Sequence, residues 1–292
     1  MSLNKKELNF YKKNGYLVKE KLISNIEITK INSLIKKILK REETKTTKIK
    51  NLGGTFKNKN DFVYNSNSSK KREILRLNNP TYYNKLFFKL SRNKNIINIA
   101  KKLLGGSVRF HHCKLNFKLP SKKGGEVSWH QDWAFYPHTN DDLITVGVYL
   151  EDCFEENGPL QVVPKSHKQK IFTHHNKKKE FVGKICEKIN FKNIKSLVGK
   201  AGTVTFHHVR TIHGSGLNLK NSKRPLMLFG YTNVDAWPLT SDNSINPNEN
   251  FKKYNNSIIV GKKTLVPRFE KVPLIIPLPK KSVSIYQLQK IK

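Results

Sequence analysis

The sequence predicts a mainly β domain with helices at its N-terminal end. From about residue 108 onward, short runs rich in β-branched and aromatic residues are separated by turn signals, and no helical pattern alternates with them. Before that point, apolar residues recur at helical spacing. A chain of 292 residues of which 37% are hydrophobic can bury a core. The strand pattern favours a β-sandwich or a jelly roll.

The N-terminal part, about residues 1–106, is expected to be largely helical. Residues 5–14 predict a helix that ends at Gly15, because a glycine in the left-handed conformation commonly follows the last helical residue. A short strand is expected at residues 16–18.

A second helix is expected after Ser24 and Glu27, which have the spacing of a capping box. Behind them isoleucines recur at helical period to about residue 40, at positions 28, 31, 35 and 38. Residues 42–80 are polar and predict a long surface loop or flap. Residues 95–104 predict a further helix, closed by two glycines.

The β core is expected at about residues 107–235, and an extended, proline-containing tail at about 236–292. Val108–Lys118 alternates: one face carries Cys113, Leu115 and Phe117, and the other carries His112, Lys114 and Asn116. Further strands are expected at residues 143–150, 160–163, 203–208 and 226–232. No repeat or second domain is evident, so we interpret residues 1–292 as a single domain.

The formal charge of +35 suggests a nucleic-acid partner at first sight. However, basic residues are spread along the whole chain, and only eight of the 56 are arginine. Lysine, asparagine and isoleucine share A/T-rich codons, so drift in composition explains the charge as well. Three scattered cysteines exclude a disulfide framework. No apolar run is long enough for a membrane span, and we expect a cytoplasmic protein.

The most informative segment is Trp129-His130-Gln131-Asp132-Trp133. On a strand, His130 and Asp132 would project from the same face. A second histidine from a distant strand would complete a 2-His-1-carboxylate triad, which leaves open positions on Fe(II). His213 is the best candidate, because it follows a predicted strand and glycines at 214 and 216 allow close backbone approach.

Arg224 strengthens this interpretation. It lies eleven residues after His213, at the start of an apolar run. A guanidinium that enters a buried strand is costly unless it meets an anion. A dicarboxylate co-substrate would supply one.

These motifs together resemble the phytanoyl-CoA dioxygenase family of Fe(II)/2-oxoglutarate-dependent oxygenases, which also contains ectoine hydroxylase. The resemblance runs from about residue 8 to residue 235. It rests on residues 10–18, 129–142 and 157–168, and on His213-Gly214-Ser215 with Arg224.

The resemblance implies a double-stranded β-helix (a jelly roll, cupin-like) with N-terminal helices packed outside. It also implies Fe(II), with 2-oxoglutarate and O2 as co-substrates. His130, Asp132 and His213 would be the iron ligands. Four further residues match co-substrate positions: Arg224 at the distal carboxylate, Ser215 beside it, Asn116, and Lys114. Because Lys114 stands where the ectoine hydroxylase pattern has arginine, three roles stay open for it: co-substrate contact, substrate contact or neither.

Candidate substrate residues lie at the end of the motif, directly after it, or on the strand expected at residues 160–163. They are Trp133, Tyr136, His138 and Gln161, each of which has core packing or a structural role as its alternative. Four other histidines near the expected core are interpreted as packed or surface residues, namely His111, His112, His207 and His208. No residue in the sequence identifies the substrate.

The resemblance implies a hydroxylase that oxidises an aliphatic C–H bond of a small or medium-sized organic molecule and releases succinate and CO2. Asp132 favours hydroxylation over halogenation, because related halogenases replace this carboxylate with a small residue. Two alternatives stay open: a non-catalytic or regulatory binding protein on the same scaffold, and a nucleic-acid-directed oxygenase. The expected partner is a small molecule, with neither membrane nor nucleic acid, and the sequence leaves the oligomeric state open.

Overall fold

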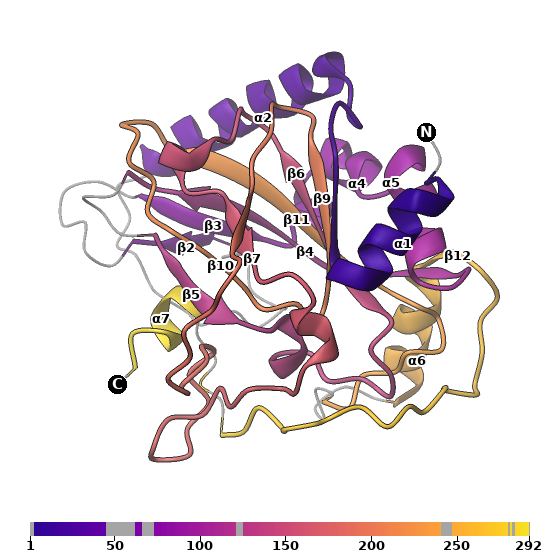
Figure 1. Cartoon of the computed structure of the whole chain (residues 1–292). Helices are drawn as coiled ribbons and strands as arrows, with labels where there is room; N and C mark the ends of the chain where they lie inside the picture. Colours follow the sequence, from indigo (N-terminus) through magenta and orange to yellow (C-terminus); the bar gives the residue numbers. More distant parts are fainter. Residues whose placement is uncertain are drawn as a thin grey trace.

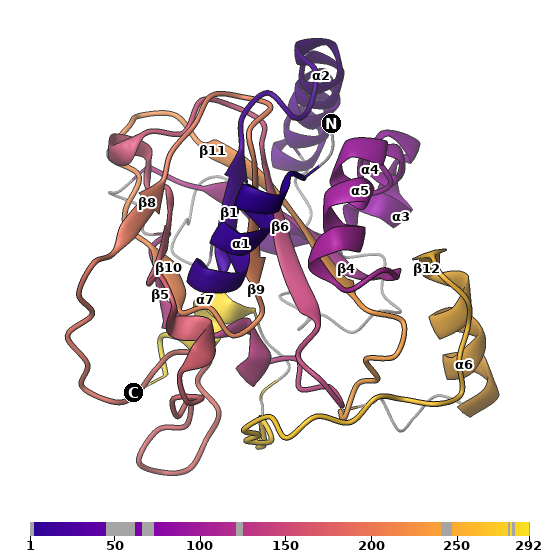
Figure 2. The ribbon, with the colours of Figure 1, turned by 45° about the vertical axis from the view of Figure 1, so that its right-hand side comes forward.

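The structure, a computed structural model, describes residues 3–44, 62–65, 73–120, 125–240, 247–279, 281 and 284–291. Within these ranges the chain is mostly β, with helices, and its strands form two antiparallel sheets that face each other (Figures 1 and 2). The larger sheet has the order β1-β9-β6-β11-β4-β3-β2, with β12 paired to β4, and the smaller has the order β5-β10-β7-β8.

The strands of the larger sheet are β1 (Tyr16–Lys19), β2 (Phe62–Tyr64), β3 (Ile74–Asn78), β4 (Val108–Lys118), β6 (Leu143–Tyr149), β9 (Val204–His208), β11 (Arg224–Thr232) and β12 (Ile258–Val260). Those of the smaller are β5 (Val127–His130), β7 (Leu160–Val162), β8 (Lys195–Leu197) and β10 (His213–Ser215). The helices are α1 (Lys5–Asn14), α2 (Asn25–Glu43), α3 (Pro80–Tyr83), α4 (Lys85–Leu90), α5 (Lys94–Leu103), α6 (Pro247–Asn256) and α7 (Ile285–Leu288).

The two N-terminal helices form as predicted, for the predicted reasons. Helix α1 ends at Gly15, whose φ of +80° is readily adopted only by glycine. Helix α2 begins after Ser24, whose side chain accepts a hydrogen bond from the backbone N–H of Glu27. Its predicted apolar stripe is buried and consists of Ile28, Ile31, Ile35 and Ile38.

Strand β11 separates the hydrophobic core from the cavity of the molecule. Met227 and Phe229 point to the face that helices α2, α4 and α5 cover, and both are fully buried in the main core with the isoleucines of α2. Leu226 and Leu228 alternate with them and line a cavity on the other face. One face of the sheet is therefore stabilised by apolar burial, and the other is available for chemistry.

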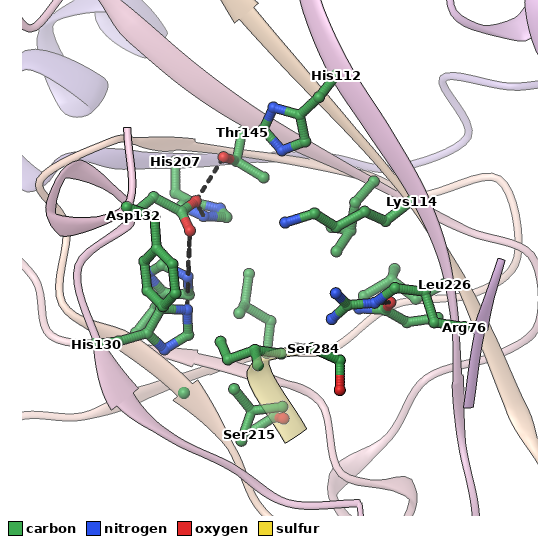
Figure 3. Close-up of a pocket in the computed structure, with 18 of the residues that line it drawn as sticks. Arg76, His112, Lys114, His130, Asp132, Thr145, His207, Ser215, Leu226 and Ser284 are labelled. Carbon is green, nitrogen blue, oxygen red and sulfur yellow. Dashed lines mark hydrogen bonds and ion pairs between the residues drawn. The ribbon is translucent and has the colours of Figure 1, made fainter. Parts of the chain in front are cut away.

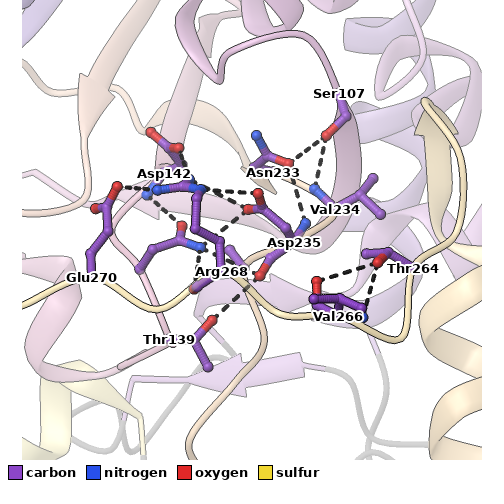
Figure 4. A network of polar contacts seen from close by, with 12 residues as sticks. Ser107, Thr139, Asp142, Asn233, Val234, Asp235, Thr264, Val266, Arg268 and Glu270 are labelled. Atoms are coloured by element: carbon purple, nitrogen blue, oxygen red, sulfur yellow. Dashed lines mark hydrogen bonds and ion pairs between the residues drawn. The ribbon is translucent and has the colours of Figure 1, made fainter.

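The predicted extended tail also contains helices α6 and α7. Arg268 fixes its middle to the body of the protein through Asp142 and Asp235, and it also pairs with Glu270 within the tail (Figure 4). The side-chain amide of Asn140 donates to the backbone oxygen of Arg268 at 3.0 Å. Beyond this point the chain returns to the cavity, where α7 forms part of the wall.

The structure differs from two other expectations. Most of the loop expected at residues 42–80 lies outside the described residues, but strands β2 and β3 fall within it. The prediction that Asp132 lies on a strand with His130 is wrong. Strand β5 ends at His130, and Asp132 begins a 3-10 helix, Asp132–Ala134. Among the described residues, none of the helices has the length and apolar character of a membrane span.

Candidate metal centre and co-substrate pocket

A cavity of about 200 Å³ lies against the inner faces of β4 and β11 and is closed on its other side by β5, β10 and α7 (Figure 3). This volume is at the small end for ligand pockets, which indicates small ligands. Its charged side chains are Asp132, Arg76, Lys114 and Arg224, and its histidines are His112, His130, His207 and His213.

The structure brings together the three donors that the sequence suggested. His213 on β10 is the direct antiparallel partner of His130 on β5, which places both imidazoles on one side of the sheet. One ligand atom each of His130, Asp132 and His213 lies within 4.8 Å of the other two. The Nε2 atoms of both histidines lie 3.8 Å from Oδ1 of Asp132.

Hydrogen bonds to the backbone fix both imidazoles in the orientation that a metal needs. Nδ1 of His130 lies 2.8 Å from the backbone oxygen of Ser128, and Nδ1 of His213 lies 2.9 Å from that of Thr211. Because each Nδ1 donates its proton there, each Nε2 keeps its lone pair facing Asp132. Both rings are buried, with 5% of their surface exposed.

Thr145 and His207 hold the carboxylate of Asp132 through its second oxygen, Oδ2. The hydroxyl of Thr145 donates to its Oδ2 at 2.6 Å, and Nε2 of His207 lies 3.5 Å from the same oxygen. Thr145 on β6 and His207 on β9 are direct cross-strand neighbours. Oδ2 is thereby occupied, and Oδ1 is directed to the two histidines.

The protonation states fit a divalent metal. Burial lowers the pKa of His130, and burial together with the neighbouring His130 and His207 lowers that of His213 well below its usual value. Burial alone would raise the pKa of Asp132, but His213 and His207 hold it well below its usual value. Two neutral imidazoles and one carboxylate are the donor set that suits Fe(II) with open coordination positions.

Arg224 occupies one end of the cavity and is held by a turn. Its Nε donates to the backbone oxygen of Asn157 at 2.9 Å, and its Nη2 donates to that of Gly158 at 2.8 Å. Gly158 has a φ of +65°, and a Cβ there would meet the backbone oxygen of Gly216 at 2.7 Å. The Asn157-Gly158-Pro159 motif thus positions the guanidinium, whose Nη1 makes no hydrogen bond within the described part of the chain.

Lys118 lies beside Arg224 as its cross-strand neighbour. It donates to the hydroxyl of Ser215 and to the backbone oxygen of Gly125, both at 2.8 Å. Burial, and to a lesser extent the nearby Arg224, lowers the pKa of Lys118 to about 7. This cluster of cations and a hydroxyl suits a carboxylate.

The wall opposite the histidines carries two more cations. Lys114 donates to the hydroxyl of Tyr136 at 2.8 Å, and Arg76 on β3 donates through Nε to the side-chain oxygen of Asn116 at 2.8 Å. Figure 3 shows Lys114 and Arg76 on the far side of the cavity from Asp132 and His130.

Most predicted site residues meet in this cavity. His130, Asp132, His213, Arg224, Ser215, Asn116, Lys114 and Tyr136 all line it. Trp133, His138 and Gln161 do not. Trp133 is buried in a separate apolar cluster, and Nδ1 of His138 is bonded to the backbone oxygen of Tyr136. Gln161 points toward Ser196. Substrate contacts for these three residues stay predictions that the cavity lining does not support.

Sequence reasoning missed Arg76, Thr145, Lys118 and the residues of α7. Arg76 lies in the segment predicted as a loop, although Leu75-Arg76-Leu77-Asn78 alternates between apolar and polar residues, which is a strand signal. Lys118 continues the polar face of β4 by one further position and could have been found that way. The sequence predicts His207 as a packed or surface residue. It is buried, but it also faces the cavity.

Comparison with known proteins gives a consistent result. The family model described as phytanoyl-CoA dioxygenase (PhyH) matches residues 11–226. A probable alpha-ketoglutarate-dependent hypophosphite dioxygenase of Stutzerimonas stutzeri is 35% identical over 278 residues, which cover 92% of this chain and 90% of that protein. An ectoine dioxygenase of Bordetella parapertussis is 25% identical and covers 84% and 78%.

The same fold occurs in a solved structure. The crystal structure of EctD from S. alaskensis with 2-oxoglutarate and 5-hydroxyectoine aligns with a TM-score of 0.61 at 17% identity, over 96% of this chain and 88% of that one.

Proposed function

This chain belongs to the phytanoyl-CoA dioxygenase family and is a 2-oxoglutarate-dependent dioxygenase that uses iron. We propose that it hydroxylates a small-molecule substrate. One oxygen atom of O2 would enter the substrate as a hydroxyl group and the other would enter succinate, with release of CO2. The observation that carries the proposal is the placement of Arg224 in the same cavity as the His130, Asp132 and His213 group.

In this proposal the three grouped side chains are the iron ligands, and Arg224 with Ser215 binds the distal carboxylate of 2-oxoglutarate. The grouping within 4.8 Å and the backbone-fixed imidazoles support the first assignment. The second assignment is supported by Nη1 of the buried Arg224, which has no hydrogen-bond partner among the described residues. We further propose that the two sheets form a double-stranded β-helix, with the N-terminal helices outside the larger sheet.

The protein's own contribution to the reaction is binding, orientation and exclusion of water. When bound, iron supplies the activation of O2 that couples decarboxylation of 2-oxoglutarate to substrate oxidation. Thr145 holds Asp132 in place for this. The apolar side chains of Phe135, Leu226 and Leu288 line the cavity and limit the access of water.

There are two candidates for the substrate bond that is oxidised. The first candidate is an aliphatic C–H bond of a small organic molecule, as expected from the sequence. The second is a P–H bond of hypophosphite, which would give phosphite. The second is supported by the 35% identity to the hypophosphite dioxygenase relative over 92% of this chain, together with the small, cation-lined cavity.

One assay tests the function and separates the two candidates. Purified protein with Fe(II), 2-oxoglutarate and O2 is incubated with hypophosphite, or with a panel of small carboxylic and amino acids. Succinate and the oxidised product are then quantified, phosphite by ³¹P NMR. We expect succinate equimolar with one oxidised product, and none with Asp132→Ala. Succinate no higher than in that variant, with every compound tested, would contradict the proposal.

A further inference from the structure

With Fe(II) and 2-oxoglutarate bound, the side chains that line the cavity would still carry an excess of positive charge. Fe(II) and the dianionic 2-oxoglutarate cancel each other, and Arg224 balances the carboxylate of Asp132. Arg76 and Lys114 then stand without a counter-charge among the residues that line the cavity. In the described part of the chain, no carboxylate lies within ion-pair distance of either side chain. Such charges inside a protein are costly unless an anion neutralises them.

Arg76 is buried, yet two of its guanidinium nitrogens have no hydrogen-bond partner among the described residues. Only 6% of its surface is exposed, and an arginine cannot relieve this burial by losing its proton. Its Nε donates to Asn116, its direct cross-strand partner, which fixes the plane of the guanidinium. Nη1 and Nη2 make no hydrogen bond within the described residues. A role confined to pairing β3 with β4 would leave these two donors without a function.

The C-terminal segment holds Arg76 from the other side. The guanidinium carbon lies 5.2 Å from the centre of the Tyr286 ring, a cation–π contact that stabilises the charge but uses none of its hydrogen-bond donors. Ser284, Ile285 and Leu288 of the same segment line the cavity. Gln289 fixes this segment to the body by accepting from the backbone N–H of Ser128 at 3.0 Å.

We propose that Arg76, with Lys114, is the binding site for the anionic group of the substrate, a two-oxygen anion such as a phosphinate or a carboxylate. The fork of Nη1 and Nη2 matches two oxygens on one atom, and the ammonium of Lys114 lies on the same wall. The inference rests on the proposed function, since it places the substrate opposite the metal ligands. It assigns Arg76 to the substrate and not to 2-oxoglutarate, which has Arg224.

The test measures binding and not turnover. Under anaerobic conditions the protein is loaded with Fe(II) and 2-oxoglutarate, and the weak visible charge-transfer band of that complex is recorded. Sodium hypophosphite or sodium acetate is then titrated in at constant ionic strength against sodium chloride, with the band and isothermal calorimetry as readouts. The two probes distinguish a phosphinate from a carboxylate as the preferred anion. The variant is Arg76→Gln, and folding is checked by thermal denaturation.

We expect one of the two anions to bind the wild type, and Arg76→Gln to bind it about 10- to 100-fold more weakly, with unchanged affinity for 2-oxoglutarate. The control is Arg92→Gln, which removes an arginine that also lies over an aromatic ring, 3.8 Å from the Phe88 centroid, but does not line the cavity. It should bind as the wild type does.

Three results would overturn the inference: wild-type affinity for the anion in Arg76→Gln, loss of 2-oxoglutarate binding in that variant, or no binding of either anion by the wild type. Each is distinguishable from failure of the proposed function, which would show as absence of the charge-transfer band itself.

Discussion

The substitution Thr145→Val tests whether the orientation of Asp132 determines iron binding. The hydroxyl of Thr145 donates to Oδ2 at 2.6 Å, and only 8% of the residue's surface is exposed, so solvent is poorly placed to replace it. Valine keeps the shape and suits a strand. Without the hydroxyl, Oδ2 retains only Nε2 of His207 at 3.5 Å, and the carboxylate is free to turn.

Loss of a group that orients a metal ligand typically costs 10- to 100-fold in metal affinity. We therefore expect the affinity of Thr145→Val for Fe(II) to fall by about 10- to 100-fold, or about 1.4 to 2.7 kcal/mol. The assay is anaerobic titration with Fe(II) at saturating 2-oxoglutarate, followed by the visible band.

The matched control is Thr205→Val. Thr205 is equally a buried strand threonine, its hydroxyl lies 3.4 Å from the backbone oxygen of Gly147, and it does not line the cavity. Iron affinity in this control should stay within about twofold of wild type. Equal affinities in the two variants would refute the idea that Thr145 positions Asp132.

Three further predictions concern the other end of the cavity. Arg224→Gln should weaken 2-oxoglutarate binding by about 10- to 100-fold and leave iron binding intact, and an unchanged 2-oxoglutarate titration would remove Arg224 as the anchor. Gly158→Ala should lower the free energy of unfolding by about 1 to 3 kcal/mol in urea, because φ is +65° and the added Cβ would meet two backbone oxygens. Gly216→Ala, where an added Cβ would meet no atom within 4 Å apart from its chain neighbours, should change the free energy of unfolding by less than about 0.5 kcal/mol, so equal losses would refute the steric argument. Lys118 has a pKa of about 7 when folded, so between pH 7 and 9 the unfolded chain binds the additional proton. Wild-type stability should therefore rise with pH relative to Lys118→Met by about 1 kcal/mol per pH unit, and parallel pH curves would contradict this.

The parts of the fold with strong local periodicity could be predicted from the sequence. Helix α2 follows from its isoleucine spacing and its Ser24 cap, and β4 follows from strict alternation. The two histidines and the aspartate were found through spacing and resemblance. The structure adds the reason that they meet, which is the cross-strand pairing of His213 with His130.

The rest depends on contacts that no local pattern encodes. Asp132 reaches the histidines from a 3-10 turn and not from a strand, so the i, i+2 argument named residues that do lie together, but through the wrong geometry. The pairing of Arg76 with Asn116 joins positions 40 residues apart. The return of the tail to the cavity as α7 was equally hidden, because its prolines predicted only extended chain.

The proposed iron and 2-oxoglutarate sites are tested most directly by a crystal structure of the protein grown anaerobically with Fe(II) and 2-oxoglutarate. We expect iron bonded to Nε2 of His130, Oδ1 of Asp132 and Nε2 of His213, with the distal carboxylate of 2-oxoglutarate on Arg224. Iron bound elsewhere, or bound without His213, would contradict this proposal.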